Sequence, residues 1–169
     1  MIFERWREGI AQIALELPRL ASLIDLVRLN EPAMVSILAA GAARVGYTPV
    51  MEANITKAVD AGNGAGKPWT GRSDLMLSSG ESFYAFEFKL SWHNSTSEWY
   101  DQCLDLAMSD AVCLSKGDCE HRYAGITSTY SNAKARECAR AYQKADNCFV
   151  LPFNETVDTG LIVMFRKVV

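Results

Sequence analysis

Apolar residues near the N-terminus recur at steps of three and four, the spacing of one face of an α-helix. This pattern predicts helix from residue 2 to about residue 29. Pro18 interrupts it, because a proline ring breaks or kinks a helix, so a second apolar helix is expected over 20–29. This N-terminal segment, residues 1–30, either joins the core or packs as an arm on another subunit.

The next helix has a clear start signal. Asn30 has a side chain suited to capping, Glu31 places an acid in the first turn, and Pro32 fits just inside a helix start. The helix is expected to run to about Arg44, where the turn sequence Gly-Tyr-Thr-Pro follows.

Apolar runs and alternating patterns then mark strands, separated by two further helical patterns. The expected strands are 50–55, 69–77, 82–90, 123–127, 148–153 and 160–168, and the expected helices are 98–111 and 131–145. The resulting order is α, β, β, β, α, β, α, β, β, which indicates an α/β domain. The 169 residues suit a single domain.

Polar groups with catalytic potential concentrate in the hairpin 71–90. Side chains alternate between the two faces of a strand, so Tyr84, Phe86, Phe88 and Leu90 form one apolar face. That face is expected to cover the core, which puts Glu87 and Lys89 together on the opposite face.

The turn of the hairpin determines which residues of the first strand lie beside Glu87 and Lys89. With Ser79 and Gly80 at its centre, Asp74 pairs with Ala85 and lies diagonal to Glu87, roughly 7 Å away on the same face. A slip of one residue would move Asp74 to the other face.

Two carboxylates this close repel each other unless a proton or a cation intervenes. Their hard oxygen atoms suit Mg²⁺ or Mn²⁺. Lys89 beside such an ion would hold a phosphate oxygen, or orient and help deprotonate an attacking water. The arrangement is typical of phosphodiester hydrolysis.

Asp74 followed by Glu87-Phe88-Lys89 on the next strand resembles the PD-(D/E)xK nuclease superfamily. The resemblance implies a restriction-endonuclease-like αβββαβ core, with a central mixed sheet flanked by helices. Residues 31–128 would supply that core, residues 1–30 an additional N-terminal helical segment, and residues 129–169 a C-terminal helix and strands.

The resemblance also implies roles and a substrate. Asp74 and Glu87 would be metal ligands, Lys89 the catalytic lysine, and Glu31 a further catalytic and metal-supporting acid, with Mg²⁺ or Mn²⁺ as the cofactor. The implied substrate is nucleic acid, DNA ahead of RNA. Two departures stand out: no proline precedes Asp74, and Gln102 is followed four residues later by Leu106 rather than tyrosine.

Several residues outside the acidic pair are candidates for contact with nucleic acid. Arg72 shares the face of Asp74, and Gln102 follows the lysine motif on the next helix. Lys67 ends the loop AGNGAGKP, which lacks the glycine and the Ser/Thr of a phosphate-binding loop. Arg136 and Arg140 form a basic stripe on the later helix, which is either a phosphate contact or a solvated face.

Charge and composition limit the function further. Seventeen basic and twenty acidic side chains give a net charge of −3, which argues against a broadly basic nucleic-acid coat but not against a local basic groove. The alternative is therefore a catalytically inactive member of the same fold, acting as a nucleic-acid- or protein-binding regulatory module. A homodimer through the N-terminal helices is one way to widen the binding surface.

The five cysteines are odd in number and lack a CxxC pair, so reduced thiols are expected rather than a disulfide framework or a zinc ribbon. The charged N-terminus does not fit a secretory signal, and no apolar run is long enough to span a membrane. These features predict a cytoplasmic protein with no membrane partner.

Overall fold

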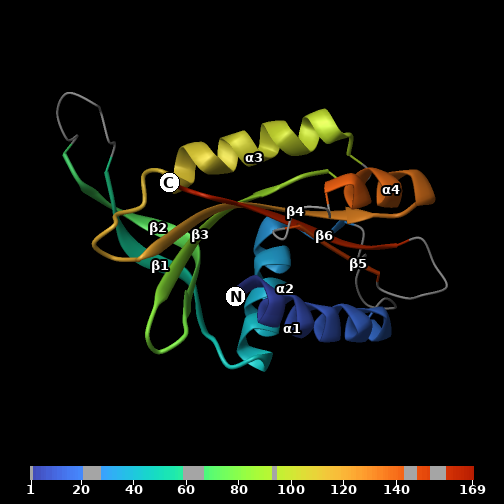
Figure 1. Ribbon diagram of the computed structural model, residues 1–169, viewed down its shortest axis with the longest axis horizontal. Coiled ribbons are helices and arrows are strands. Elements are labelled where there is room, and N and C mark those ends of the chain that lie inside the picture. The colour runs from blue at the N-terminus through green and yellow to red at the C-terminus, as the bar shows by residue number, and fades with distance from the viewer. Residues whose placement is uncertain (1, 21–27, 59–66, 93–94, 143–147, 153–158) are drawn as a thin grey trace.

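A mixed sheet of six strands forms the centre of the molecule in the computed structural model, which describes residues 2–20, 28–58, 67–92, 95–142, 148–152 and 159–169 (Figure 1). The strands are β1 (Thr48–Lys57), β2 (Trp69–Ser78), β3 (Phe83–Leu90), β4 (His121–Tyr130), β5 (Cys148–Pro152) and β6 (Gly160–Lys167). Their spatial order is β1-β2-β3-β4-β6-β5, and neighbours run antiparallel except for the parallel pair β3 and β4.

Four helices precede and interrupt this series of strands in the described part of the chain. They are α1 (Ile2–Glu16), α2 (Glu31–Arg44), α3 (Ser97–Ala111) and α4 (Ala133–Tyr142), with a short 3₁₀ helix, η1 (Leu17–Leu20), after α1. The expected α/β class with a central mixed sheet is confirmed. Most of the helix expected over 20–29 lies outside the described residues. No helix in the described part of the chain is long and apolar enough to cross a membrane.

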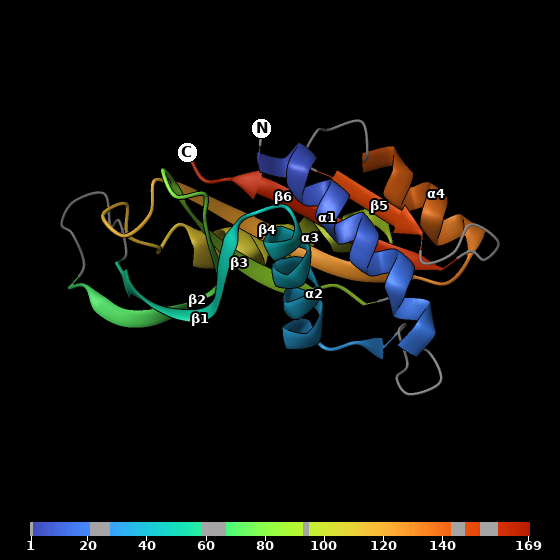
Figure 2. The ribbon, with the colours of Figure 1, turned by 90° about the horizontal axis from the view of Figure 1, so that it is seen from below.

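Helices α1 and α2 cover one face of the sheet (Figure 2). Trp6 of α1 is fully buried there and packs edge-to-face against Phe86. Its indole N–H donates a hydrogen bond to the carbonyl of Leu38 in α2 at 2.8 Å. The N-terminal segment, as far as it is described, is therefore part of the core rather than a detached arm.

Helix α3 covers the opposite face, as Figure 1 shows. Its Tyr100, Cys103 and Ala107 pack with Ala85 of β3 and Ala124 of β4. Both faces of β3 are consequently buried, and Glu87 is only 4% exposed although it lies opposite the large aromatic core. The three cysteines with described side chains are free thiols.

The register of the β2–β3 hairpin differs from the expected one by two residues. Ala85 pairs with Met76, not with Asp74, because the strands close at Ser78 and Phe83 around a four-residue loop. Gly80 takes a positive φ of 87° in that loop, where glycine carries no steric penalty. An even shift preserves the alternation of faces, so the assignment of residues to faces survives the error.

The start of α2 is as the sequence predicts. Asn30 caps the helix by accepting a hydrogen bond from the amide of Ala33 at 3.0 Å, with Pro32 in the first turn. The cap fixes the start of α2 at Glu31, and the side chain of this residue faces the end of β3.

Candidate active site

The site forms where β2 leaves β3. Regular pairing between these strands ends at Leu75 and Phe86. At the same level, pairing between β1 and β2 skips Glu52 and Asp74, and Glu52 has a φ of 52°. Positive φ in a non-glycine residue is a strained conformation that often accompanies a functional site.

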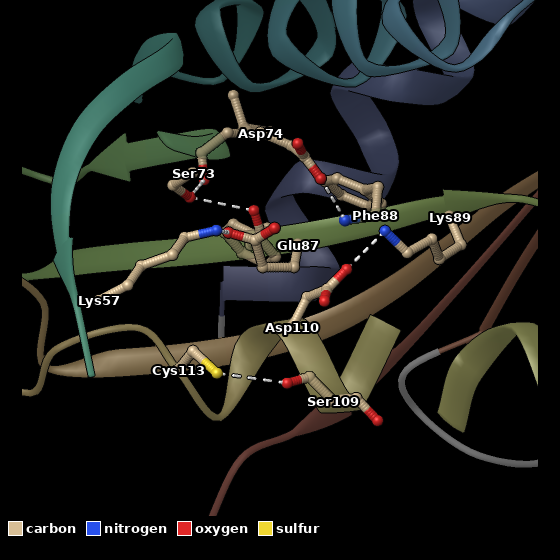
Figure 3. Close-up of polar contacts among 11 residues, drawn as sticks. Lys57, Ser73, Asp74, Glu87, Phe88, Lys89, Ser109, Asp110 and Cys113 are labelled. Atoms are coloured by element: carbon tan, nitrogen blue, oxygen red, sulfur yellow. Dashed lines mark hydrogen bonds and ion pairs between the residues drawn. The ribbon is translucent and has the colours of Figure 1, made fainter. Parts of the chain in front are cut away.

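Side chains replace the missing strand pairing. The Asp74 carboxylate accepts the amide N–H of Phe88 at 2.6 Å, and the buried hydroxyl of Ser73 donates to the carbonyl of Phe86 at 3.1 Å (Figure 3). Because its Oδ2 is tied to the backbone of β3, Asp74 is held beside Glu87. Burial raises the pKa of Asp74, although the Phe88 amide and Lys89 oppose that rise.

Glu87 is the most buried acid of the site. The Nζ atom of Lys57 lies 3.0 Å from its Oε1 atom, and both side chains are largely covered. Burial, followed by the charge of Asp74, raises the pKa of Glu87 to about 7 in spite of Lys57. Asp74 thus opposes the ionisation of Glu87, as the proximity predicted from the sequence suggested.

Lys89 follows on the same face of β3 and reaches toward α3. Its Nζ atom lies 2.5 Å from Oδ2 of Asp110 (Figure 3). Burial works to lower the pKa of Lys89, but Asp110, Glu31 and Asp74 outweigh it and raise the pKa overall. The lysine is therefore a firmly held cation at the end of the strand.

Glu31 reaches the same strand end from the first turn of α2. Its Oε2 atom accepts the amide N–H of Leu90 at 2.8 Å. Burial raises the pKa of Glu31, the Leu90 hydrogen bond opposes the rise, and the charge of Asp74 adds to it. The four predicted catalytic residues, Glu31, Asp74, Glu87 and Lys89, are thus brought together from three elements.

Two site residues were missed by sequence reasoning. Lys57 comes from the end of β1 and Asp110 from the last turns of α3, and each pairs with a predicted residue. No local motif marks them, because their roles depend on which turn of α3 crosses the sheet and on the register of β1 against β2.

Of the predicted nucleic-acid contacts, Arg72 lies beside this cluster, because its partner Glu52 acts on the pKa of Asp74. Arg72 is exposed and its guanidinium forms an ion pair with Glu52 at 2.9 Å. Lys67 is exposed just before β2, and residues 59–66, which contain most of the AGNGAGKP loop, lie outside the described residues. Gln102 is exposed on α3, eight residues before Asp110, which corresponds to about 12 Å along a helix.

Arg136 and Arg140 are farther still. They belong to α4, which packs against β5 at the edge of the sheet opposite β1 (Figure 1). Arg136 is half-buried and Arg140 is exposed. The basic stripe is therefore not part of the acidic site.

The donor chemistry of the acidic pair suits a divalent cation. Among the described residues no group of three or more His, Cys, Asp or Glu side chains is arranged to hold a metal ion. Mg²⁺, however, is commonly bound through one or two carboxylates, with water and substrate oxygens as the other ligands. The half-buried Asp74 and the buried Glu87, whose pKa is raised by burial and by the charge of Asp74, fit that role.

A pocket of about 500 Å³ adjoins this cluster on the α2 side. Its wall includes Leu29, Asn30, Leu90 and Trp92, so it begins where Glu31 meets the end of β3. Trp92 is 72% exposed, which leaves an aromatic surface open beside the site.

Comparisons of the chain with protein-family models, with curated proteins and with solved structures find no match.

Proposed function

We propose that this protein is a metal-dependent nuclease of the PD-(D/E)xK type, hydrolysing phosphodiester bonds in nucleic acid, with DNA favoured over RNA. The observation that carries the proposal is the convergence of Glu31, Asp74, Glu87 and Lys89 at the point where β2 leaves β3. Acids and a lysine separated by 58 positions in the chain meet there, which a chance D…ExK pattern on a surface hairpin does not explain.

The order of elements supports the finer fold assignment. From α2 to β4 the chain runs α, β, β, β, α, β, with an antiparallel β1-β2-β3 meander and β4 parallel to β3. Helix α3 makes the connection between the two parallel strands. This order is what the resemblance to restriction-endonuclease-like proteins implies, and it positions the acids of β2 and β3 between α2 and α3.

A bound Mg²⁺ or Mn²⁺ would supply charge stabilisation at the phosphate and an activated water, with Asp74 and Glu87 as its ligands and Glu31 in support. The chain's own groups orient these acids. The amide of Phe88 holds Asp74, and the amide of Leu90 holds Glu31.

Lys89 has the properties of a phosphate-holding cation rather than of a proton acceptor. Asp110 keeps it protonated by raising its pKa, so at neutral pH it donates hydrogen bonds. We therefore assign Lys89 to holding a phosphate oxygen or orienting the attacking water, and not to removing the water's proton.

One observation favours the second candidate, an inactive binding or regulatory module acting with a nucleic acid or a protein partner. Glu87 and Lys89 each already have an oppositely charged partner, in Lys57 and Asp110. A site whose charges are paired within the protein does not need a metal ion to neutralise them.

The deciding experiment is cleavage of supercoiled plasmid and of single-stranded DNA and RNA in Mg²⁺, Mn²⁺ or EDTA. We expect cleavage that requires the metal and falls by about 10²-fold or more in Lys89→Met, because the variant removes a hydrogen-bond donor from the developing charge. Lys116→Met, at an exposed position, removes the same charge outside the site and should keep full activity.

Absence of metal-dependent cleavage on all three substrates would favour the binding module. Equal cleavage by the wild type and by Lys89→Met would contradict the assignment of the site.

A further inference from the structure

Lys57 occupies an unusual position for a lysine that ends an edge strand. Its side chain is only 15% exposed, and its ammonium group lies 3.0 Å from Oε1 of Glu87 instead of extending into solvent. Because β2 lies between β1 and β3 in the sheet, the side chain passes over β2 to reach the carboxylate, and Figure 3 shows it extending from β1 to Glu87.

Gly71 provides the path for this crossing. In β2 it pairs with Ile55, so it lies beside the stem of Lys57. A Cβ atom at residue 71 would lie 2.7 Å from Cδ of Lys57 and 3.1 Å from its Cγ and Cε. Any side chain there would therefore displace the lysine stem.

We propose that Lys57 is a tethered counter-ion that occupies the cation position at Glu87 and is displaced when a divalent cation binds. This inference concerns the metal site of the proposed function, but it does not depend on catalysis. In the metal-free protein Lys57 stabilises a buried carboxylate that would otherwise be unpaired, a costly arrangement.

Competition follows from charge and space. A divalent cation coordinated by Oε1 of Glu87 would lie within a few ångströms of the Lys57 ammonium, and like charges at that distance repel strongly in a buried site. Lysine has a flexible four-carbon stem, so the group can withdraw without movement of the strand. Lys89 does not compete in this way, because its ammonium is held by Asp110 on α3.

A role of Lys57 in positioning Glu87 would predict the opposite change in metal affinity. If Lys57 served to position Glu87 for metal binding, its removal would weaken the affinity for metal. If it competes, removal strengthens the affinity. The sign of the change therefore distinguishes the two roles.

The test is Mn²⁺ binding to the metal-free protein without nucleic acid, measured by the electron paramagnetic resonance signal of free Mn²⁺ and by calorimetry at pH 8. We expect Lys57→Met to bind Mn²⁺ about tenfold more tightly than the wild type. Gly71→Ala should tighten binding by a smaller factor, because it displaces the lysine but keeps its charge.

Lys116→Met is the matched control, because it removes the same charge from an exposed position outside the site. It should leave the affinity for Mn²⁺ within twofold of the wild type. Circular dichroism of each variant establishes folding, and Gly71→Ala keeps the inference testable if Lys57→Met does not fold.

Unchanged or weaker Mn²⁺ binding in both Lys57→Met and Gly71→Ala would overturn the inference, as would the absence of Mn²⁺ binding in all proteins. Failure of the proposed nuclease function would give a different result. Tighter Mn²⁺ binding by the variants, with no cleavage of any nucleic acid, would leave the counter-ion role intact and remove only the nuclease.

Discussion

Glu87 combines burial, a neighbouring acid and a lysine, and these together set how its charge responds to pH. Its pKa is about 7, compared with 4.5 for an ordinary glutamate. The folded protein therefore holds this proton more tightly than the unfolded chain does. By linkage, the stability that this proton contributes is present below pH 4.5 and is lost as the pH rises through about 7.

We accordingly expect the free energy of unfolding attributable to Glu87 to fall by up to about 3 kcal/mol between pH 4.5 and pH 8. Urea unfolding of the metal-free protein at several pH values measures it. Glu87→Gln has the same shape but does not titrate, so the stability difference between wild type and variant isolates this group from Asp74 and Glu31. A difference that stays constant with pH would show that Glu87 ionises normally.

At the scale of elements, two glycines determine how closely α1 and α2 pack. Gly9 of α1 and Gly41 of α2 meet where the helices cross, and a Cβ atom on Gly9 would lie 1.9 Å from the carbonyl oxygen of Gly41. The contact is with backbone, so it cannot be relieved by turning a side chain. Only glycine at this crossing lets α2 approach α1 closely enough to bury Trp6 and Leu38.

Gly9→Ala should therefore destabilise the protein by about 1–3 kcal/mol, the usual cost of overpacking, although alanine is the better helix former. Thermal and urea unfolding provide the measurement. The comparison is Ala40→Gly at an exposed position of α2, where helix propensity alone predicts a loss of about 1 kcal/mol. Increased stability in Gly9→Ala would mean that the helices are farther apart than described.

At the scale of the whole molecule, charge is distributed unevenly with respect to the site. The net charge is −3, and the basic stripe of α4 lies beside β5 while the acidic cluster lies between β2 and α3. A short nucleic acid bound at the cluster cannot also reach α4 unless it spans the sheet. A long substrate is able to contact both.

Arg140→Ala should therefore leave cleavage of a short single-stranded oligonucleotide within twofold of the wild type. If α4 contacts phosphates of a longer substrate, the same variant should weaken the binding of long DNA. It should also reduce the number of counter-ions released on binding by about one, which lowers the slope of log affinity against log salt concentration. Titrations at several salt concentrations measure this. Equal losses on short and long substrates would instead place Arg140 near the site.

The sequence by itself determined the features that depend on neighbouring residues. The Asn30 cap, the three strands β1 to β3 and the shared face of Glu87 and Lys89 follow from local hydrogen bonding and from the alternation of side chains. Asp74, Glu87 and Lys89 share a hairpin, so their proximity follows from these local patterns, whereas Glu31 joins them through the packing of α2 near the end of β3.

Only the tertiary structure decided what surrounds them. The register of the hairpin depended on a four-residue loop, and the positive φ of Glu52 reflects how β1 and β2 bend where β2 leaves β3. Lys57 pairs with Glu87 only because β1 lies beside β2 in the sheet. Asp110 pairs with Lys89 only because α3 crosses over β3. Such contacts join distant segments, and the packing that creates them leaves no periodic signal in the chain.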